Sequence, residues 1–358
     1  MPLQFGDKRG VSSVVHVAVH RSQFPESVRR DLIESLRRRR INHKFHYDSV
    51  RQTQKWLALH EACSPARREA DCETLYDRSF DAAARRLKAG RVHVIGLGCG
   101  GGWKDTRLLT RLKAGGRTVF YTPCDVSVAM TLVARRAALR VVPKGRCFPL
   151  VCDLASADDL PGTLEAQGPP DAARLVTFFG MLPNFEVSVI LPKLAAIVRR
   201  EDLLLAGANL APGRNYDDGM KRILPQYDNV LTRDWLMTFL LDLGVERDDG
   251  EIRFCIEDDA AGGMLKRVAA DFHFSRARRI QVDAARFTFR PGESIRLFFS
   301  YRHRPGQIRS LLDPHGLRVM ERWVSASEEE GVFLCRRKQD AGVRPAALKK
   351  SSSPPAPL

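Results

Sequence analysis

The chain has 358 residues and a formal net charge of +16, from 58 lysines and arginines against 42 aspartates and glutamates. This length allows one large domain or two modest ones. No apolar run is long enough to span a bilayer, and the amino-terminal residues lack the features of a secretory signal. We therefore expect a cytoplasmic protein, most simply a monomer, that does not bind membranes.

The eight cysteines form no Cys-x-x-Cys pair, so we expect reduced thiols and no metal site. The positive charge suggests nucleic acid as a partner. However, the basic residues are scattered, and the densest run, Arg37 to Arg40, closes a predicted helix, where cations complement the helix dipole. No aromatic and basic platform of the RNA-binding kind is present. We therefore do not expect nucleic acid as a partner.

The first 90 residues are mainly helical in pattern. Residues 1–20 predict a loose amino-terminal arm with at most one short strand. Residues 24–40 predict an amphipathic helix, because Val28, Leu32 and Leu36 share one face. Residues 41–90 predict further helices, and Gly90 closes the last of them.

Between residues 91 and 210 the pattern changes to strands that alternate with helices. Strands are predicted at 91–98, 117–126, 147–154, 173–181 and 201–210. Such alternation is typical of a parallel sheet with helices on both faces, which is an α/β fold.

The alternation ends after Leu210. Residues 211–244 predict helices, and residues 251–304 predict antiparallel strands. A helix and two closing strands follow, at 318–324 and 331–337. The two closing strands fit a Rossmann-like methyltransferase sheet better than a dehydrogenase sheet. Residues 339–358 are rich in proline and serine and predict a disordered tail.

Ligand-type residues end three successive strands of this α/β region. Gly96, Gly98 and Gly100 follow the first strand, where bare backbone allows a sharp turn and close approach of a ligand. Asp125 ends the second strand and could accept hydrogen bonds from ribose hydroxyls. Asp153 ends the third and could accept from an adenine amine, although it could instead cap a helix. This arrangement suits S-adenosylmethionine.

Five motifs in this sequence resemble those of the histidine-specific methyltransferase family, which uses S-adenosylmethionine. They are a Tyr-Asp pair, a "WKDTRLL" segment, "YTPCDVS", and "GMLPNF" with a later "GESI". They begin at residues 47, 103, 121, 180 and 292, so the resemblance covers most of the chain. The family has a class I methyltransferase sheet with an added α+β substrate or cap domain.

The resemblance implies a role for several residues. Gly98, Lys104, Asp125 and Asp153 would contact the cofactor, and Asn184 would hold the acceptor over the reaction centre. It also implies the domain organisation: 21–90 as the helical part of the cap, 91–210 as the cofactor-binding core, 211–300 as the rest of the cap, and 301–338 as a return to the core.

The sequence departs from the family where an acceptor would bind. The family has Glu-x-Ser on a strand that grips histidine, whereas this chain has Phe298 before Ser300. The paired tyrosines of the family are replaced by Cys63 and Ser64. A site that loses a polar partner for the imidazole ring binds histidine poorly, so histidine is not the expected acceptor.

We therefore predict a methyltransferase of secondary metabolism that acts on an apolar or aromatic amine or amino acid. Asn184, Tyr227 and Ser300 would be its catalytic residues, and Phe179 and Phe298 would line the acceptor pocket. Tyr47 and Tyr227 could face the sulfonium through cation–π contact. Two alternatives stay open: a cyclase that converts S-adenosylmethionine to azetidine-2-carboxylate and methylthioadenosine, and an RNA-directed or non-catalytic protein.

Overall fold

The computed structural model describes residues 14–259 and 265–338. The predicted tail at 339–358 and most of the predicted arm therefore lie outside the described residues. No helix within the described residues is long and apolar enough to cross a membrane.

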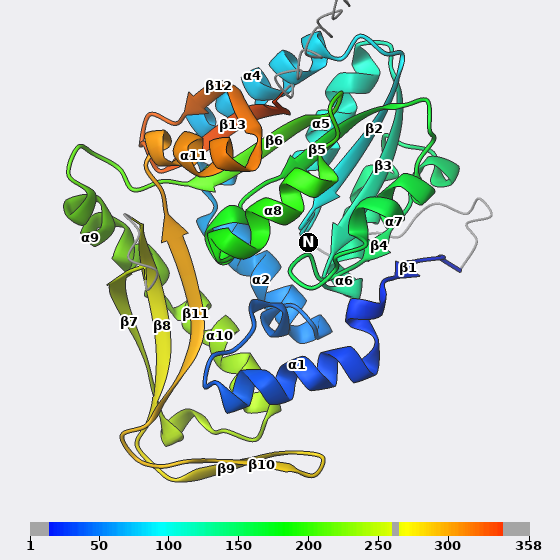
Figure 1. Ribbon diagram of the computed structural model, residues 1–358. Helices are drawn as coiled ribbons and strands as arrows, with labels where there is room; N and C mark the ends of the chain where they lie inside the picture. Colours follow the sequence, from blue (N-terminus) through cyan, green and yellow to red (C-terminus); the bar gives the residue numbers. More distant parts are fainter. Residues whose placement is uncertain (1–13, 260–264, 339–358) are drawn as a thin grey trace, which may run out of the picture.

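The larger part of the molecule is an eight-stranded sheet, shown in Figure 1. Its order is β1 (Ala18–Val19), β4 (Leu150–Val151), β3 (Thr118–Asp125), β2 (Arg91–Leu97), β5 (Ala173–Phe178), β6 (Leu203–Asn209), β13 (Glu330–Arg337) and β12 (Leu317–Val324). The strands from β1 to β6 pair in parallel, and β13 runs antiparallel to both of its neighbours. The predicted α/β class is confirmed.

Helices cover both faces of this sheet because its strands are almost wholly apolar. In β2, every residue after Arg91 is buried, as expected for a parallel strand with helices on both sides. One face packs against α4 (Ala70–Arg86), α5 (Trp103–Ala114) and α6 (Val128–Ala138). The other face packs against α7 (Leu160–Gln167), α8 (Val187–Ile197) and α11 (Pro305–Leu312).

A smaller α+β unit, which we call the cap, lies beside the core sheet (Figure 1). It contains an antiparallel sheet in the order β11 (Ser294–Arg302), β8 (Lys266–Phe274) and β7 (Gly250–Asp258), and the hairpin β9 (Arg278–Val282) with β10 (Ala285–Phe289). Its helices are α1 (Pro25–Arg37), α2 (Val50–Cys63), α9 (Tyr216–Tyr227) and α10 (Val230–Asp242).

One hydrophobic cluster holds the cap together across a long stretch of sequence. Leu36 and Phe45 from the amino-terminal segment pack with Trp235, Phe272 and Phe298 from the later segment. The cap therefore forms only when residues at least 190 positions apart meet. The remaining short helices are α3 (Pro65–Arg68), η1 (Arg21–Gln23), η2 (His43–His46), η3 (Lys144–Arg146), η4 (Leu182–Asn184), η5 (Arg247–Asp249) and η6 (Asp313–His315).

Three details differ from the sequence prediction. Helix α4, predicted within the cap segment 21–90, packs on the core sheet, and its Tyr76 and Phe80 are buried in the same cluster as Leu108. The short strand β1 of the predicted arm pairs with β4 at the sheet edge. The strand predicted at 147–154 is reduced to Leu150–Val151. Periodicity shows that a helix has an apolar face, but it cannot show which sheet that face covers.

Candidate functional site

A cavity of about 830 Å³ lies between the carboxyl ends of the core strands and the cap. This volume falls within the range of about 300–1,000 Å³ that is usual for small-molecule sites. Parallel sheets bind ligands at this edge, where the strand order reverses, and here the reversal lies between β2 and β5. The wall contains all but one of the predicted site residues: Tyr47, Gly98, Gly100, Lys104, Asp125, Asp153, Phe179, Asn184, Tyr227, Phe298 and Ser300.

The exception is Gly96, which lies within β2 and does not line the cavity. A Cβ at Gly96 would meet the Asp105 carboxylate at 2.1 Å. That carboxylate accepts hydrogen bonds from Tyr121 and Thr177, at 2.7 and 2.8 Å. In this structure Gly96 therefore makes room for a buried polar cluster behind the strand and has no contact with the cavity.

The next two glycines have the conformation that the turn requires. Gly98 and Gly100 have φ angles of +64° and +51°, in the left-handed region that favours glycine. A Cβ at Gly98 would also meet the Met181 side chain at less than 3 Å. The backbone at Gly98 therefore has no room for a side chain and lies open to the cavity.

Asp125, the last residue of β3, lies beside this glycine turn. Its Oδ2 accepts a hydrogen bond from the Gly100 N–H at 2.9 Å, and its Oδ1 accepts from the Ser127 N–H at 3.1 Å. Burial raises the pKa of Asp125 to about 6, although these backbone donors act in the opposite direction. The carboxylate is ionised at neutral pH and is positioned to accept hydrogen bonds.

Asp153 follows β4 and lies under the amino-terminal segment. Its Oδ1 accepts from the Ala155 N–H at 2.9 Å, so it closes a local turn. It does not cap a helix, since α7 begins only at Leu160. Its Oδ2 lies 3.4 Å from the Lys44 ammonium, which also pairs with Asp31 at 2.6 Å.

Lys104, in the first turn of α5, is already paired within the protein. Its Nζ donates to Tyr76 Oη at 2.5 Å and lies 3.0 Å from the carboxylate of buried Glu330. Burial alone would raise the pKa of Glu330, but the charge of Lys104 and the Tyr76 hydroxyl outweigh it and hold the pKa below its usual value. Lys104 therefore reaches the cavity as part of a neutralised pair.

The opposite wall of the cavity comes from the cap. Phe298 and Ser300 alternate along β11 and so share one face, and Tyr227 at the end of α9 donates a hydrogen bond to Ser300 Oγ at 2.9 Å. The Phe298 ring lies 6.0 Å from Tyr227 and 5.9 Å from Trp235, measured between ring centroids. The side chain at the position of the family glutamate is thus enclosed by aromatic rings.

His43 also lies in this wall, which the sequence analysis did not predict. Its ring stacks on Phe298 at 5.1 Å with an interplanar angle of 16°. The Phe299 N–H donates to His43 Nε2 at 3.3 Å. Burial holds the pKa of His43 well below its usual value, so the ring is neutral and, in this hydrogen-bond arrangement, carries its proton on Nδ1.

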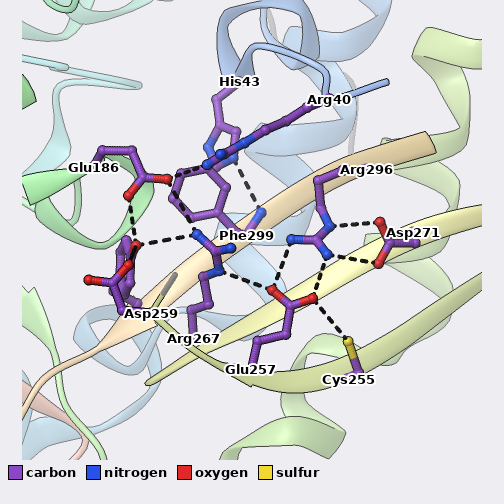
Figure 2. A network of polar contacts seen from close by, with 11 residues as sticks. Arg40, His43, Glu186, Cys255, Glu257, Asp259, Arg267, Asp271, Arg296 and Phe299 are labelled. Atoms are coloured by element: carbon purple, nitrogen blue, oxygen red, sulfur yellow. Dashed lines mark hydrogen bonds and ion pairs between the residues drawn. The ribbon is translucent and has the colours of Figure 1, made fainter. Parts of the chain in front are cut away.

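Asn184 ends the short helix η4 between core and cap. Its side-chain amide makes no hydrogen bond within the described residues, so it is available to a ligand. Two residues later, Glu186 is the N-cap residue of α8 and contacts the cap (Figure 2). Its carboxylate pairs with Arg40, accepts from Tyr301 Oη at 2.7 Å and lies 3.3 Å from Arg267.

The same network contains a group of Cys255, Glu257 and Asp271 whose ligand-type atoms lie close enough to suggest a metal site. Both carboxylates are occupied by Arg296, which contacts Glu257 at 2.5 Å and Asp271 at 2.7 Å (Figure 2). The group is therefore an ion-pair cluster that joins β7, β8 and β11.

Several other wall residues were missed in the sequence analysis. The period of two along β11 could have identified Arg302, because it follows Ser300 on the same face. The others reach the cavity through tertiary packing, which no local pattern reveals: Trp56, His60, Trp235 and Glu330.

Comparison with known proteins identifies a family. The family described as "Histidine-specific methyltransferase, SAM-dependent" matches residues 28–240 and 256–337. No curated protein sequence matches significantly.

The solved structures that match this chain are distant from it in sequence. The magnesium protoporphyrin IX methyltransferase of Synechocystis PCC 6803, with S-adenosylhomocysteine bound, is 14% identical; the match covers 81% of this chain and 95% of that one, with a TM-score of 0.41. The CcbJ methyltransferase of Streptomyces caelestis is 12% identical over 74% and 89% of the two chains, with a TM-score of 0.36. The Burkholderia thailandensis 1,6-didemethyltoxoflavin-N1-methyltransferase is 11% identical over 80% and 87%, with a TM-score of 0.38.

Proposed function

Because the chain belongs to the family of histidine-specific, S-adenosylmethionine-dependent methyltransferases, we propose that it methylates a small apolar or aromatic molecule other than histidine. The observation that carries this proposal is the acceptor wall of the cavity. Phe298 takes the place of the family glutamate, lies only 6% exposed, and is surrounded by the rings of His43, Tyr227 and Trp235.

The residues on the core side of the cavity fit the cofactor of the family. The bare backbone at Gly98 lines the cavity and would face the methionine part, Asp125 would accept from the ribose hydroxyls, and Asp153 would accept from the adenine amine. Lys104 is a poorer candidate for binding the cofactor carboxylate directly, because Glu330 already neutralises it. We assign to Lys104 and Glu330 the role of shaping this end of the cavity.

S-adenosylmethionine supplies a methyl group that is already activated on a sulfonium, so the protein mainly has to align the acceptor and exclude water. The free amide of Asn184 and the hydroxyl of Ser300 would orient the acceptor. The aromatic faces of Tyr47 and Tyr227 would favour a positively charged sulfonium nearby. Phe179 and Phe298 would select an apolar ring.

The same wall argues against histidine as the acceptor. A neutral imidazole carries one N–H donor, and burying this donor without an acceptor costs about 1–3 kcal/mol. Phe298 offers no polar atom. Of the residues that replace the paired tyrosines, Cys63 is exposed and Ser64 is short. The protein should therefore not turn over L-histidine above background.

The test is to incubate the purified protein with S-adenosylmethionine alone, with L-histidine and with a fractionated metabolite extract, and to identify the products by mass spectrometry. We expect S-adenosylhomocysteine only with an extract fraction, together with a product that is 14 mass units heavier than its precursor for each methyl group added. Methylthioadenosine formed without any acceptor would instead indicate the cyclisation reaction. Efficient methylation of L-histidine would refute our account of the acceptor wall.

A further inference from the structure

We propose that Arg302 fixes the direction of the hydrogen bonds in the acceptor wall, so that Ser300 presents a proton to the cavity and a ligand that presents a lone pair is favoured. This inference rests on the proposed function and deepens it. The acceptor would be an aromatic or apolar molecule that carries a hydrogen-bond acceptor, such as a ring nitrogen or a carbonyl oxygen.

Arg302 is the fixed end of the chain of hydrogen bonds. It is buried, with 7% of its surface exposed. Its Nη1 donates to two backbone carbonyls, those of Leu210 at 3.2 Å and Glu329 at 3.4 Å. Its Nε–H donates to Tyr227 Oη at 3.0 Å. A guanidinium stays protonated and can only donate hydrogen bonds, so Tyr227 must act as the acceptor in this contact.

The next link follows from the proton count of a phenol. Tyr227 has one hydroxyl proton, and its oxygen already accepts from Arg302. The other polar partner of this hydroxyl within the described residues is Ser300 Oγ, at 2.9 Å. In the structure Tyr227 donates this proton to Ser300, an arrangement that satisfies both contacts. The proton of Ser300 then has no acceptor among the described residues, and Ser300 lines the cavity.

Hydrogen bonds in such a series polarise one another, so a hydroxyl whose oxygen accepts a hydrogen bond becomes a better hydrogen-bond donor. The positive charge of Arg302 at the start of the series strengthens this effect. His43, which stacks on Phe298, is also set as a donor. Its Nε2 accepts from the backbone, and its Nδ1 is buried without a partner in the described structure. Two donors therefore flank Phe298.

The proposal can be tested with two bicyclic probes of similar size. At pH 8, isoquinoline has a ring nitrogen that only accepts, whereas indole has a ring N–H that only donates. Their dissociation constants would be measured by calorimetry in the presence of saturating S-adenosylhomocysteine. We expect isoquinoline to bind about fivefold more tightly than indole or better, the equivalent of one neutral hydrogen bond. Equal binding, tighter binding of indole, or no binding of isoquinoline at millimolar concentration would overturn the proposal.

Variants of Arg302 separate its effect on hydrogen-bond direction from its effect on side-chain packing. Arg302→Met keeps the length of the side chain but no longer donates to Tyr227. The Tyr227 hydroxyl can then turn, and Ser300 can accept a hydrogen bond from the ligand. The preference for isoquinoline should then fall to about twofold or less. Arg302→Lys retains a group that can only donate and should retain the preference. A preference that survives in Arg302→Met would contradict the proposal.

A second variant decides the matter if Arg302→Met does not fold. Ser300→Ala should weaken the binding of isoquinoline by about fivefold and leave the binding of indole unchanged. Equal effects on the binding of both probes would overturn the proposal. The affinity for S-adenosylhomocysteine, measured on every variant without a probe, is the control for the cofactor side. If the wild-type protein failed to bind S-adenosylhomocysteine, the proposed function would fail, whereas a wrong probe preference with normal binding would count against Arg302 alone.

Discussion

The two walls of the cavity differ in how the chain assembles them. On the core side, Gly98, Asp125 and Asp153 lie within 56 consecutive residues and each follows a neighbouring parallel strand. On the cap side, His43, Tyr227 and Phe298 are brought together from across 256 residues. The core side retains the residues expected of the family, and the cap side does not. Under the proposed function, binding of the cofactor and choice of the acceptor are therefore carried by separate parts of the fold.

The sharpest way to separate the two walls is Phe298→Glu. This change places a carboxylate among the aromatic rings of His43, Tyr227 and Trp235. We expect turnover of an active extract fraction to fall by about 100-fold, corresponding to ~2–3 kcal/mol, because burial of a charge without a partner is costly. The affinity for S-adenosylhomocysteine should change by less than about twofold. Phe298→Leu is the matched apolar control and should retain most activity.

Asp125→Ala tests the opposite wall. Removal of a charged hydrogen-bond acceptor should weaken the binding of S-adenosylmethionine by ~1.5–3 kcal/mol, which raises its dissociation constant roughly 10- to 150-fold. Calorimetry measures this effect directly, and Asp158→Ala, on an exposed carboxylate, is the control. Unchanged affinity in Asp125→Ala would show that the cofactor lies elsewhere.

The pH dependence of cofactor binding probes the same carboxylate. The pKa of Asp125 is raised to about 6 by burial, and the protonated form loses its capacity to accept from both ribose hydroxyls. Affinity for S-adenosylmethionine should therefore fall as the pH falls, by about tenfold between pH 7 and pH 5 if only the ionised form binds. Asp125→Asn should bind weakly at every pH and show a flat profile over this range. An equally steep profile in Asp125→Asn would assign the titration to another group.

The smallest expected effect lies at the junction of the two walls. Glu186, the N-cap residue of α8, lies two residues after Asn184 and contacts Arg40, Arg267 and Tyr301 of the cap. Because the carboxylate is about one-third exposed, the effect of Glu186→Gln on activity should be modest, a loss of about three- to tenfold. We expect the loss in the KM for the acceptor, with the affinity for S-adenosylhomocysteine unchanged. Glu251→Gln, in an exposed pair with Arg253 on β7, should have no effect.

The sequence determined the α/β core and most of the core side of the cavity wall. The physical reason is that these features depend on local sequence. In an alternating βα chain, each strand ends at the same edge of the sheet, so residues that follow successive strands meet there. Gly98, Asp125 and Asp153 could be placed together on this basis, and the structure puts all three in the cavity wall. Gly96 does not line the cavity because it lies two residues before Gly98, inside β2.

Only the tertiary structure decided which side chains face the acceptor and how they are paired. Period two on β11 gives a shared face to Phe298, Ser300 and Arg302, but the partners of that face come from α9 and from the segment before α2. The pairing of Lys104 with Glu330 likewise joins residues 226 positions apart. Such contacts depend on how the cap packs against the core, because long-range packing sets the distances that determine a hydrogen bond or an ion pair, and a linear pattern carries no information on them.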